Sequence, residues 1–276
     1  SLLPSEFLNP RGHILSQPRD KTLCVRDDTQ VWIFDQWGEV HRQDQARGDV
    51  GVVRGEIGGV GLPPPHRGQV VALAAADLAR FRGREGVVGL AEVMNVPGVL
   101  AGDGDLRAKM DLFEVIDGHA PSLSGKDLNA YIYAGVQSDH ESTTLAEARE
   151  RLLRGMYVMI REGSTEQNLR GLLPLVDRCT APRCCFATDD RHAGTLVRDG
   201  HIDDCIRKAV SYGLDVELAL RMATLSAAER FRLHDRGAIA PGRLADFCVI
   251  DDPDRFCVLR TFKRGVEVLD LSLIHI

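Results

Sequence analysis

Residues 144–176 read TLAEARERLLRGMYVMIREGSTEQNLRGLLPLV, and this stretch decides the fold class. Its first four residues, Thr144–Glu147, have the form of a capping box, which marks the start of a helix. The apolar residues after it recur at helical spacing. Residues 157–161 then form a short apolar run that predicts a buried strand. Residues 164–167 predict a second capping box, followed by another helix.

The same alternation of short apolar runs and helical segments begins near Ala75 and continues to Phe231. Strands that alternate with helices at this spacing are typical of βα units with a parallel sheet. We therefore expect an α/β protein in which residues 75–232 form an incomplete (β/α)8 barrel of the TIM type. Strand-like runs at residues 245–251 and 264–269 predict that residues 233–270 are part of a small flanking β-domain.

Four residues of metal-binding types each follow a short apolar run: Glu92, His119, His140 and Asp189. The carboxyl ends of barrel strands meet at one rim, so these side chains are expected to lie close together. Neutral imidazoles and carboxylates suit Zn, Fe or Mn. A bound divalent metal lowers the pKa of its water and so activates it for hydrolysis. The sequence therefore predicts a hydrolytic metal site at this rim.

Within that site we expect Asp189 to act as the general base that takes a proton from water and passes it to a leaving nitrogen. Glu92 is expected to be a ligand that bridges two metals. Taken singly, each residue has a plainer interpretation, because acidic residues at strand ends often cap the next helix. Recurrence at the same point of successive units favours the metal site.

Other polar residues lie near the same rim by sequence, where they either orient ligands, contact substrate or are simply solvated: Asp139, Glu141, Arg161, Glu162, Asp190, Arg191 and His192. The candidate substrate-binding residues among them are Glu141, Arg161, Asp190 and His192. His201 is expected to be a surface residue at the start of a helix.

Composition excludes several classes of function. The net charge is -6 and the pI about 5.9, which gives no electrostatic case for a nucleic-acid or anionic-membrane partner. No segment approaches the roughly 18–20 apolar residues of a membrane span, and no signal peptide is visible. The seven cysteines are odd in number and contain no Cys-x-x-Cys pair. This pattern favours reduced thiols in a cytoplasmic protein over disulfides or structural zinc.

Several motifs together closely resemble the prokaryotic adenine deaminases of the amidohydrolase superfamily. The likeness covers roughly residues 75–269. Its motifs are Gly89–Asn95, Asp117–Pro121, Leu123–Tyr131, Ser138–Glu141, Met159–Ser164, Thr188–His192 and Asp235–Gly242.

The resemblance implies an enzyme of adenine catabolism and purine salvage that converts adenine and water to hypoxanthine and ammonia. It also implies a two-metal centre containing Mn, Fe or Zn. The bridging glutamate of the family matches Glu92, and its last-strand aspartate matches Asp189. Its two later histidines match His119 and His140. A homo-oligomer is an open expectation.

The chain departs from the family before Ala75, where it has neither the His-x-His pair nor the Asp-Pro-His-Glu segment. Residues 1–74 are expected to be irregular, or a mistranslated part of the gene, and Leu271–Ile276 an artefactual tail. The family's C-terminal domain is expected to be missing, and this chain by itself to be inactive. Two alternatives stay open: another amidohydrolase acting on a cyclic amide or amino-heterocycle, and a non-catalytic barrel remnant that serves as a binding or scaffold module.

Overall fold

The computed structural model describes residues 57–58, 74–84, 86–253 and 255–268. Apart from residues 57, 58 and 74, the regions predicted to be irregular or artefactual, 1–74 and 271–276, fall outside this described part.

The main sheet has six strands whose order in space is their order in the chain. They are β1 (Ile57–Gly58), β2 (Leu90–Val93), β3 (Ile116–Gly118), β4 (Ser138–Asp139), β5 (Tyr157–Arg161) and β6 (Cys184–Ala187). Each strand from β2 to β6 is parallel to the next, and β1 is antiparallel to β2. Each new strand is added on the same side of the previous one, so the strand order never reverses, as in the wall of a barrel. The predicted partial barrel is therefore confirmed.

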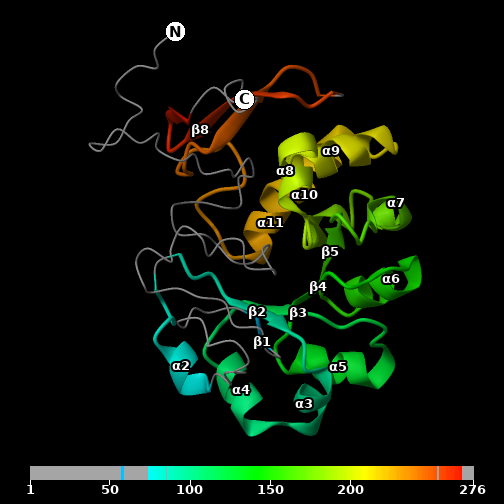
Figure 1. Ribbon diagram of the computed structural model, residues 1–276, viewed down its shortest axis with the longest axis vertical. Helices are drawn as coiled ribbons and strands as arrows, with labels where there is room; N and C mark the ends of the chain where they lie inside the picture. The colour runs from blue at the N-terminus through cyan, green and yellow to red at the C-terminus, as the bar shows by residue number, and fades with distance from the viewer. Residues whose placement is uncertain (1–56, 59–73, 85, 254, 269–276) are drawn as a thin grey trace.

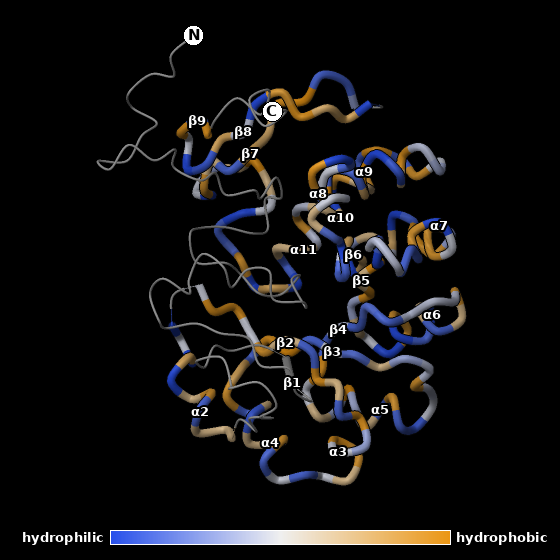
Figure 2. The backbone as a smooth tube through the Cα atoms, viewed as in Figure 1, coloured by the Kyte–Doolittle hydropathy of each residue, from blue (hydrophilic) through white to orange (hydrophobic). Residues whose placement is uncertain are grey.

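The helices that connect these strands all lie on one side of them, which is the outer side of the barrel wall (Figure 1). Those between β2 and β6 are α3 (Val96–Ala101), α4 (Gly104–Met110), α5 (Gly125–Tyr133), α6 (Leu145–Leu153), α7 (Leu169–Leu172), η2 (Leu173–Leu175) and η3 (Ala181–Arg183). The others are α2 (Ala75–Ala79), α8 (Ala193–Asp199), α9 (Ile202–Ser211), α10 (Val216–Ala223) and α11 (Leu225–Arg230). Hydropathy varies along each helix in Figure 2, and no described helix is long and apolar enough to cross a membrane.

One of the two predicted capping boxes is confirmed and the other is wrong. The hydroxyl of Thr144 accepts the Glu147 amide at 3.3 Å, and the Glu147 carboxylate accepts the Thr144 amide at 3.1 Å. Ser164 caps no helix, because α7 begins only at Leu169. The amides of Ser164 and Thr165 instead donate to the Asp190 carboxylate, at 3.0 and 2.8 Å. A carboxylate from the loop after β6 thus accepts the hydrogen bonds of these two backbone amides, and no helix begins at Ser164.

The two faces of the sheet bury different clusters. Val158 and Ile160 of β5 pack outward against α6, α7, α9 and α10. Met159 lies on the inner face, in a cluster with Cys185 and with Phe231, which follows α11. Cys184 and Cys185 are both fully buried and belong to the outer and the inner cluster respectively. The two adjacent cysteines thus alternate between the faces of this buried strand.

A second, antiparallel sheet follows the helical segment, and it contains β7 (Phe247–Ile250), β8 (Val258–Lys263) and β9 (Val266–Val268). The rings of Phe247 and Phe262 stack across β7 and β8 with centroids 4.5 Å apart. The first and last strands lie in the predicted runs, whereas β8 was not predicted. Its apolar and polar residues do not alternate cleanly, since both of its faces are partly exposed.

A fully buried ion pair joins the loops at the carboxyl ends of β3 and β4. Arg151 of α6 and Asp139 of β4 are each 0% exposed, and Arg151 Nε donates to Asp139 Oδ2 at 3.0 Å. The Asp139 carboxylate also accepts the Ala120 amide at 3.0 Å, and Arg151 donates to the carbonyl oxygens of Ala120 and Leu123. Arg151 thus links two parts of the site: the loop that contains His119, and the strand β4 that precedes His140.

Replacing Arg151 by methionine should destabilise the fold by about 3–5 kcal/mol, because Asp139 is left as an uncompensated buried charge. The midpoint of urea unfolding measures this change. Arg107→Ala is the matched control, because its ion pair with Asp111 is 56% exposed on both sides and should contribute no more than about 1 kcal/mol. Equal effects of the two substitutions would contradict the assignment.

Candidate metal centre

The backbone places the four predicted ligands at one end of the parallel strands. Glu92 is the third residue of β2, and His119 and His140 directly follow β3 and β4. Asp189 comes two residues after β6. Because β2 to β6 are parallel neighbours, these positions meet at the carboxyl-end rim.

Three of these residues bring one ligand atom each within 4.8 Å of the others: Glu92, His119 and His140. His119 Nδ1 lies 3.3 Å from Glu92 Oε2. Donors that bind one tetrahedral ion at about 2.1 Å lie roughly 3.4 Å apart. His119 Nδ1 is also buried and has no hydrogen-bond partner among the described residues. A carboxylate and two imidazoles at this spacing, one of them with an unsatisfied nitrogen, fit a divalent metal such as Zn, Fe or Mn.

Asp189 stands outside this three-residue group. Its Oδ2 accepts a hydrogen bond from Arg161 Nη1 at 2.8 Å, while its buried Oδ1 has no partner among the described residues. The same Arg161 nitrogen also bonds Glu141. Glu141 Oε1 in turn lies 3.5 Å from His119 Nδ1 and 3.4 Å from His140 Nε2. Arg161 therefore connects Asp189 to the histidines through Glu141, and two candidate substrate-binding residues lie beside the cluster.

The backbone is strained at two of the candidate ligands. Glu92 has φ = 27° and Asp189 has φ = 50°, both in a region that side chains other than glycine rarely adopt. At Glu92 the pairing of β2 with β3 also shifts its register between Leu90 and Val93. Such conformations cost of order 1–3 kcal/mol and concentrate at functional sites. Two of the six described non-glycine residues with positive φ are thus the residues predicted to act in catalysis.

The cluster carries more negative than positive charge, and the pKa shifts reflect this. Burial alone lowers the pKa of His140, but the carboxylates of Asp117, Glu92 and Asp139 outweigh it and raise this pKa to about 10. Burial raises the pKa of Asp189, against the opposing charges of His140 and Arg161. A cation at the cluster would satisfy the same carboxylates and would compete with the proton on His140.

Gly118 and Tyr131 fix the position of His119. A Cβ atom at Gly118 would lie 2.5 Å from the carbonyl oxygen of Ser138 and 2.6 Å from Val136 Cγ1, so only glycine lets β3 and β4 approach here. The hydroxyl of Tyr131 donates to the Val93 carbonyl and accepts the His119 amide, the latter at 3.1 Å. It thereby ties the ends of β2 and β3 together.

The other two candidate substrate-binding residues have recorded contacts outside the cluster. Asp190 accepts the amides of Ser164 and Thr165. His192 precedes α8, is exposed, and donates its amide to the Ser164 hydroxyl. Through these contacts the Asp190 carboxylate and the His192 backbone hold the loop after β5, and substrate binding by their side chains stays a prediction.

His201 is the N-cap residue of α9, at the start of a helix as predicted. It is only partly exposed, and its Nε2 lies 3.0 Å from the hydroxyl of Thr188, next to Asp189. Sequence reasoning also missed the buried polar pair of Asp117 and Ser138. The signal was present, since both residues belong to the motifs that contain His119 and His140.

Comparisons with known proteins agree with this arrangement. The sequence profile of the amidohydrolase family matches residues 69–268. The chain is 86% identical over 198 residues to an adenine deaminase of Methanoculleus marisnigri, covering 72% of this chain and 38% of that protein. It is 60% identical over 200 residues to an adenine deaminase of Methanoregula boonei, covering 72% of this chain and 36% of that protein. The chain thus spans little more than a third of the length of these relatives.

Two solved structures share the fold at low sequence identity. N-acetyl-D-glucosamine-6-phosphate deacetylase from Mycobacterium smegmatis superimposes with a TM-score of 0.53 at 17% identity, over 72% of this chain and 60% of that one. A beta-aspartyl dipeptidase from Fervidobacterium islandicum gives 0.51 at 15% identity, over 75% of this chain and 62% of that one. These likenesses concern the fold alone.

Replacing Gly118 by alanine should destabilise the protein by roughly 1–3 kcal/mol, the usual cost of an overpacked site. It should also weaken metal binding, because the clash with Ser138 displaces His119. Thermal unfolding and metal titration measure the two effects. Gly171→Ala is the control, since its Cβ has open space and should stabilise by up to about 1 kcal/mol. A harmless Gly118→Ala would show that the close approach of the strands is not needed.

Asp189→Asn should raise the melting temperature of the chelator-treated protein at pH 7.5, and by less at pH 4. A carboxyl group whose folded pKa is raised contributes stability below its unfolded pKa, and this is lost as pH rises through the folded pKa. Asparagine also tolerates positive φ. Asp177→Asn is the opposite control, because backbone hydrogen bonds from Thr180 and Cys179 lower that pKa. It should lower the melting temperature at pH 7.5. The same sign of change in both variants would refute the assignment.

Proposed function

The chain belongs to the amidohydrolase family, and we propose that it is part of an enzyme that hydrolyses adenine to hypoxanthine and ammonia. The observation that carries this proposal is the meeting of Glu92, His119 and His140 within 4.8 Å at the carboxyl-end rim. Identity of 86% to an adenine deaminase of Methanoculleus marisnigri supports adenine over other amino-heterocycles and cyclic amides.

Glu92, His119 and His140 would hold a divalent Mn, Fe or Zn ion, which supplies the Lewis acidity that activates water. Glu92 is also the residue that would bridge to a second ion, with Asp189 as a ligand there. Asp189 accepts the proton of the attacking water through its free Oδ1, and then donates a proton to the leaving nitrogen. The water oxygen bonds to the purine carbon that bears the amino group, and the carbon–nitrogen bond breaks to release ammonia.

Arg161 and Glu141 have supporting roles in this proposal. The guanidinium of Arg161 holds Asp189 Oδ2, so that Oδ1 is directed away from it. Glu141 lies beside both imidazoles and is placed to accept a hydrogen bond from a ring N–H of adenine. Both side chains are largely buried, at 6% and 13% exposure, so an adenine bound here loses most of its water. Hydrogen bonds to it would therefore select strongly among similar bases.

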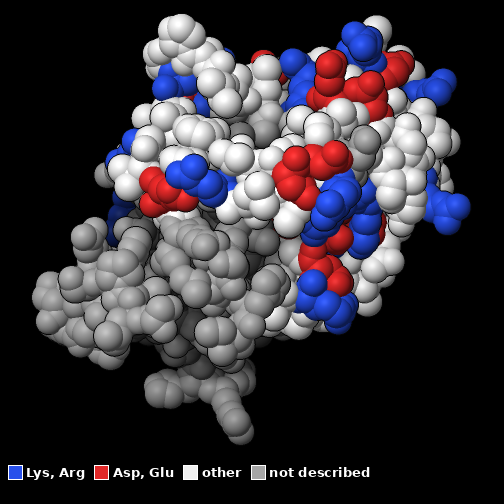
Figure 3. Space-filling model, turned by 90° about the horizontal axis from the view of Figure 1, so that it is seen from above, with Lys and Arg blue, Asp and Glu red and all other residues white. Residues whose placement is uncertain are grey.

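The setting of the enzyme is proposed from its cysteines and its surface charge. Six cysteines of the described residues form no disulfide, which supports a reducing, cytoplasmic location. A role in purine salvage is proposed from the similarity to adenine deaminases. Acidic and basic side chains are intermixed on the face shown in Figure 3, which supports a small-molecule substrate rather than a nucleic-acid partner. A homo-oligomer is compatible with these features.

Metal content is the first test. After supplementation with Mn²⁺ or Zn²⁺, the purified chain should retain about one ion, because the described residues supply one set of three ligands. His140→Gln and Glu92→Gln should abolish retention, whereas His192→Gln, at an exposed position outside the group, should not. Elemental analysis of the desalted protein gives the stoichiometry.

Retention of no metal by the unsubstituted chain would favour a non-catalytic barrel remnant. If metal is retained, adenine should raise the melting temperature of the loaded chain more than hydantoin, a cyclic amide, does. A larger shift with hydantoin would move the proposal to another amidohydrolase activity.

A further inference from the structure

A line of buried polar side chains crosses the interior of the barrel wall behind His140. It begins at Arg230, the last residue of α11, and passes through Ser138 and Asp117. These residues come from three elements far apart in sequence, and none of them is among the four candidate ligands.

Each contact in the line has a defined direction. Arg230 Nη2 donates to the Ser138 hydroxyl, at 2.5 Å, and to the Ile116 carbonyl, at 2.9 Å. Because the Ser138 oxygen accepts from Arg230, its own proton is free to donate, and it does so to Asp117 Oδ1 at 2.5 Å. The Gly118 amide donates to the same oxygen at 2.9 Å.

The other oxygen of Asp117 faces His140. Oδ2 lies 3.7 Å from His140 Nδ1, which is an electrostatic contact rather than a full hydrogen bond. Oδ2 has no hydrogen-bond partner among the described residues, so no other donor competes for it. Nε2 of the same ring faces Glu141 and the candidate metal centre.

All four of these polar side chains are buried. Asp117 is 2% exposed, Ser138 0%, Arg230 2% and His140 1%. A buried carboxylate needs a cation or several donors, and a buried arginine needs acceptors. Arg230 and Asp117 provide the charge balance for each other across Ser138, and this fixes all three side chains in one arrangement.

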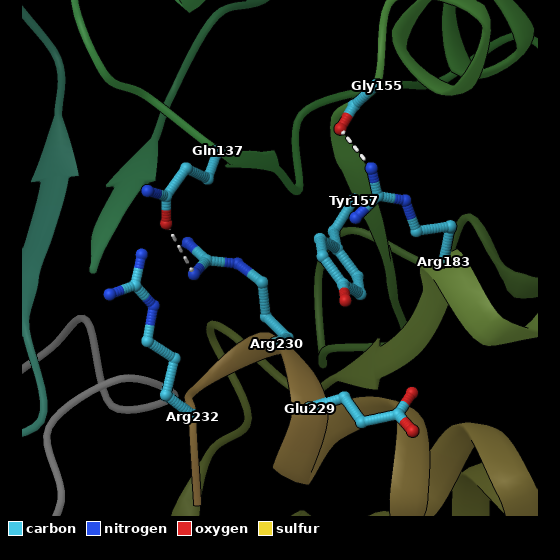
Figure 4. A pocket seen from close by; sticks show the side chains of 7 residues that line it. All are labelled: Gln137, Gly155, Tyr157, Arg183, Glu229, Arg230 and Arg232. Carbon is cyan, nitrogen blue, oxygen red and sulfur yellow. Dashed lines mark hydrogen bonds between the residues drawn. The ribbon is translucent and has the colours of Figure 1, made fainter. Parts of the chain in front are cut away.

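Arg230 enters the barrel wall from the end opposite to the metal centre. A cavity of about 330 Å³ opens there, lined by Gln137, Gly155, Tyr157, Arg183, Glu229, Arg230 and Arg232 (Figure 4). Gln137 directly precedes β4, and Tyr157 begins β5, whereas the candidate ligands follow the other ends of the strands. The line thus spans from one rim to the other.

We propose that Asp117, Ser138 and Arg230 are positioning residues that hold His140 as a metal ligand through Nε2. The inference deepens the proposed function and rests on its metal site. Asp117 Oδ2 favours the tautomer with its proton on Nδ1, which leaves the Nε2 lone pair for the ion. Ser138 and Arg230 hold the carboxylate in the orientation that this requires. Partners that orient a ligand in this way typically change metal affinity 10–100-fold.

Ser138→Ala is the sharpest test, since it removes one hydroxyl group and keeps the shape of the core. Zinc affinity, measured by competition with a chromophoric chelator, should fall roughly tenfold, and Asp117→Asn should weaken it up to about 100-fold. Arg230→Lys, which keeps a buried cation, should lose less affinity than Arg230→Met. Nitrogen-15 NMR of the labelled imidazoles in the metal-free protein, recorded above pH 10 so that the His140 ring is neutral, should show the Nδ1–H form in the parent and a tautomer mixture in Ser138→Ala.

Two kinds of control separate positioning from general destabilisation and from charge. Ser226 is also 0% exposed and donates to the Ala181 carbonyl at 2.8 Å, so Ser226→Ala removes a comparable buried hydroxyl away from the line. Arg183→Gln and Arg232→Gln remove positive charge from the same cavity but not from the line. All three controls should leave zinc affinity and the His140 signal unchanged.

The inference is overturned if Ser138→Ala has the same zinc affinity and the same His140 tautomer as the parent. It is also overturned if Ser226→Ala or Arg183→Gln loses as much zinc affinity as Ser138→Ala. If the unsubstituted chain binds no zinc, the metal site itself falls. The NMR comparison of metal-free parent and Ser138→Ala, recorded above pH 10 where the His140 ring is neutral, then decides alone whether the line sets the tautomer.

Discussion

Parallel backbone pairing between successive strands is the constraint on which the rest of this structure depends. Each of β2 to β5 is hydrogen bonded in parallel to the strand that follows it in the chain, so every crossover brings the next strand end to the same rim. Residues that lie 27, 21 and 49 positions apart in sequence, from Glu92 through His119 and His140 to Asp189, therefore come to one edge. A sheet that reversed direction would have divided them between two edges.

Buried polar contacts join the ends of neighbouring strands. Arg151 and Asp139 join the loops after β3 and β4, and Tyr131 joins the ends of β2 and β3. Burying an ion pair gives little net stability over an apolar replacement, but breaking one is costly. Such contacts define a single arrangement of the loops, which a site assembled from several strand ends requires.

Several features of the candidate site oppose folding. Glu92 and Asp189 adopt positive φ, and burial raises the pKa of the Asp189 carboxyl. Carboxylates around His140 raise its pKa to about 10, and they would equally favour a bound cation. Strain and excess negative charge at the same rim agree with a place built to hold a metal ion. The buried line from Arg230 shows that support for this place extends to the far rim.

The sequence alone determined the βα alternation, the capped helix at Thr144 and the buried strand at residues 157–161, because each rests on local periodicity or local hydrogen bonding. It also determined which four residues lie at strand ends. It did not determine that the Ser164 amide would donate to Asp190, or that His201 would contact Thr188, since those partners are 26 and 13 residues away. Only the tertiary structure decided that Arg230, 92 residues from Ser138, stands behind a candidate ligand. Local patterns fix which side chains a strand can present, but the partners of a buried charge are set by the way distant elements pack.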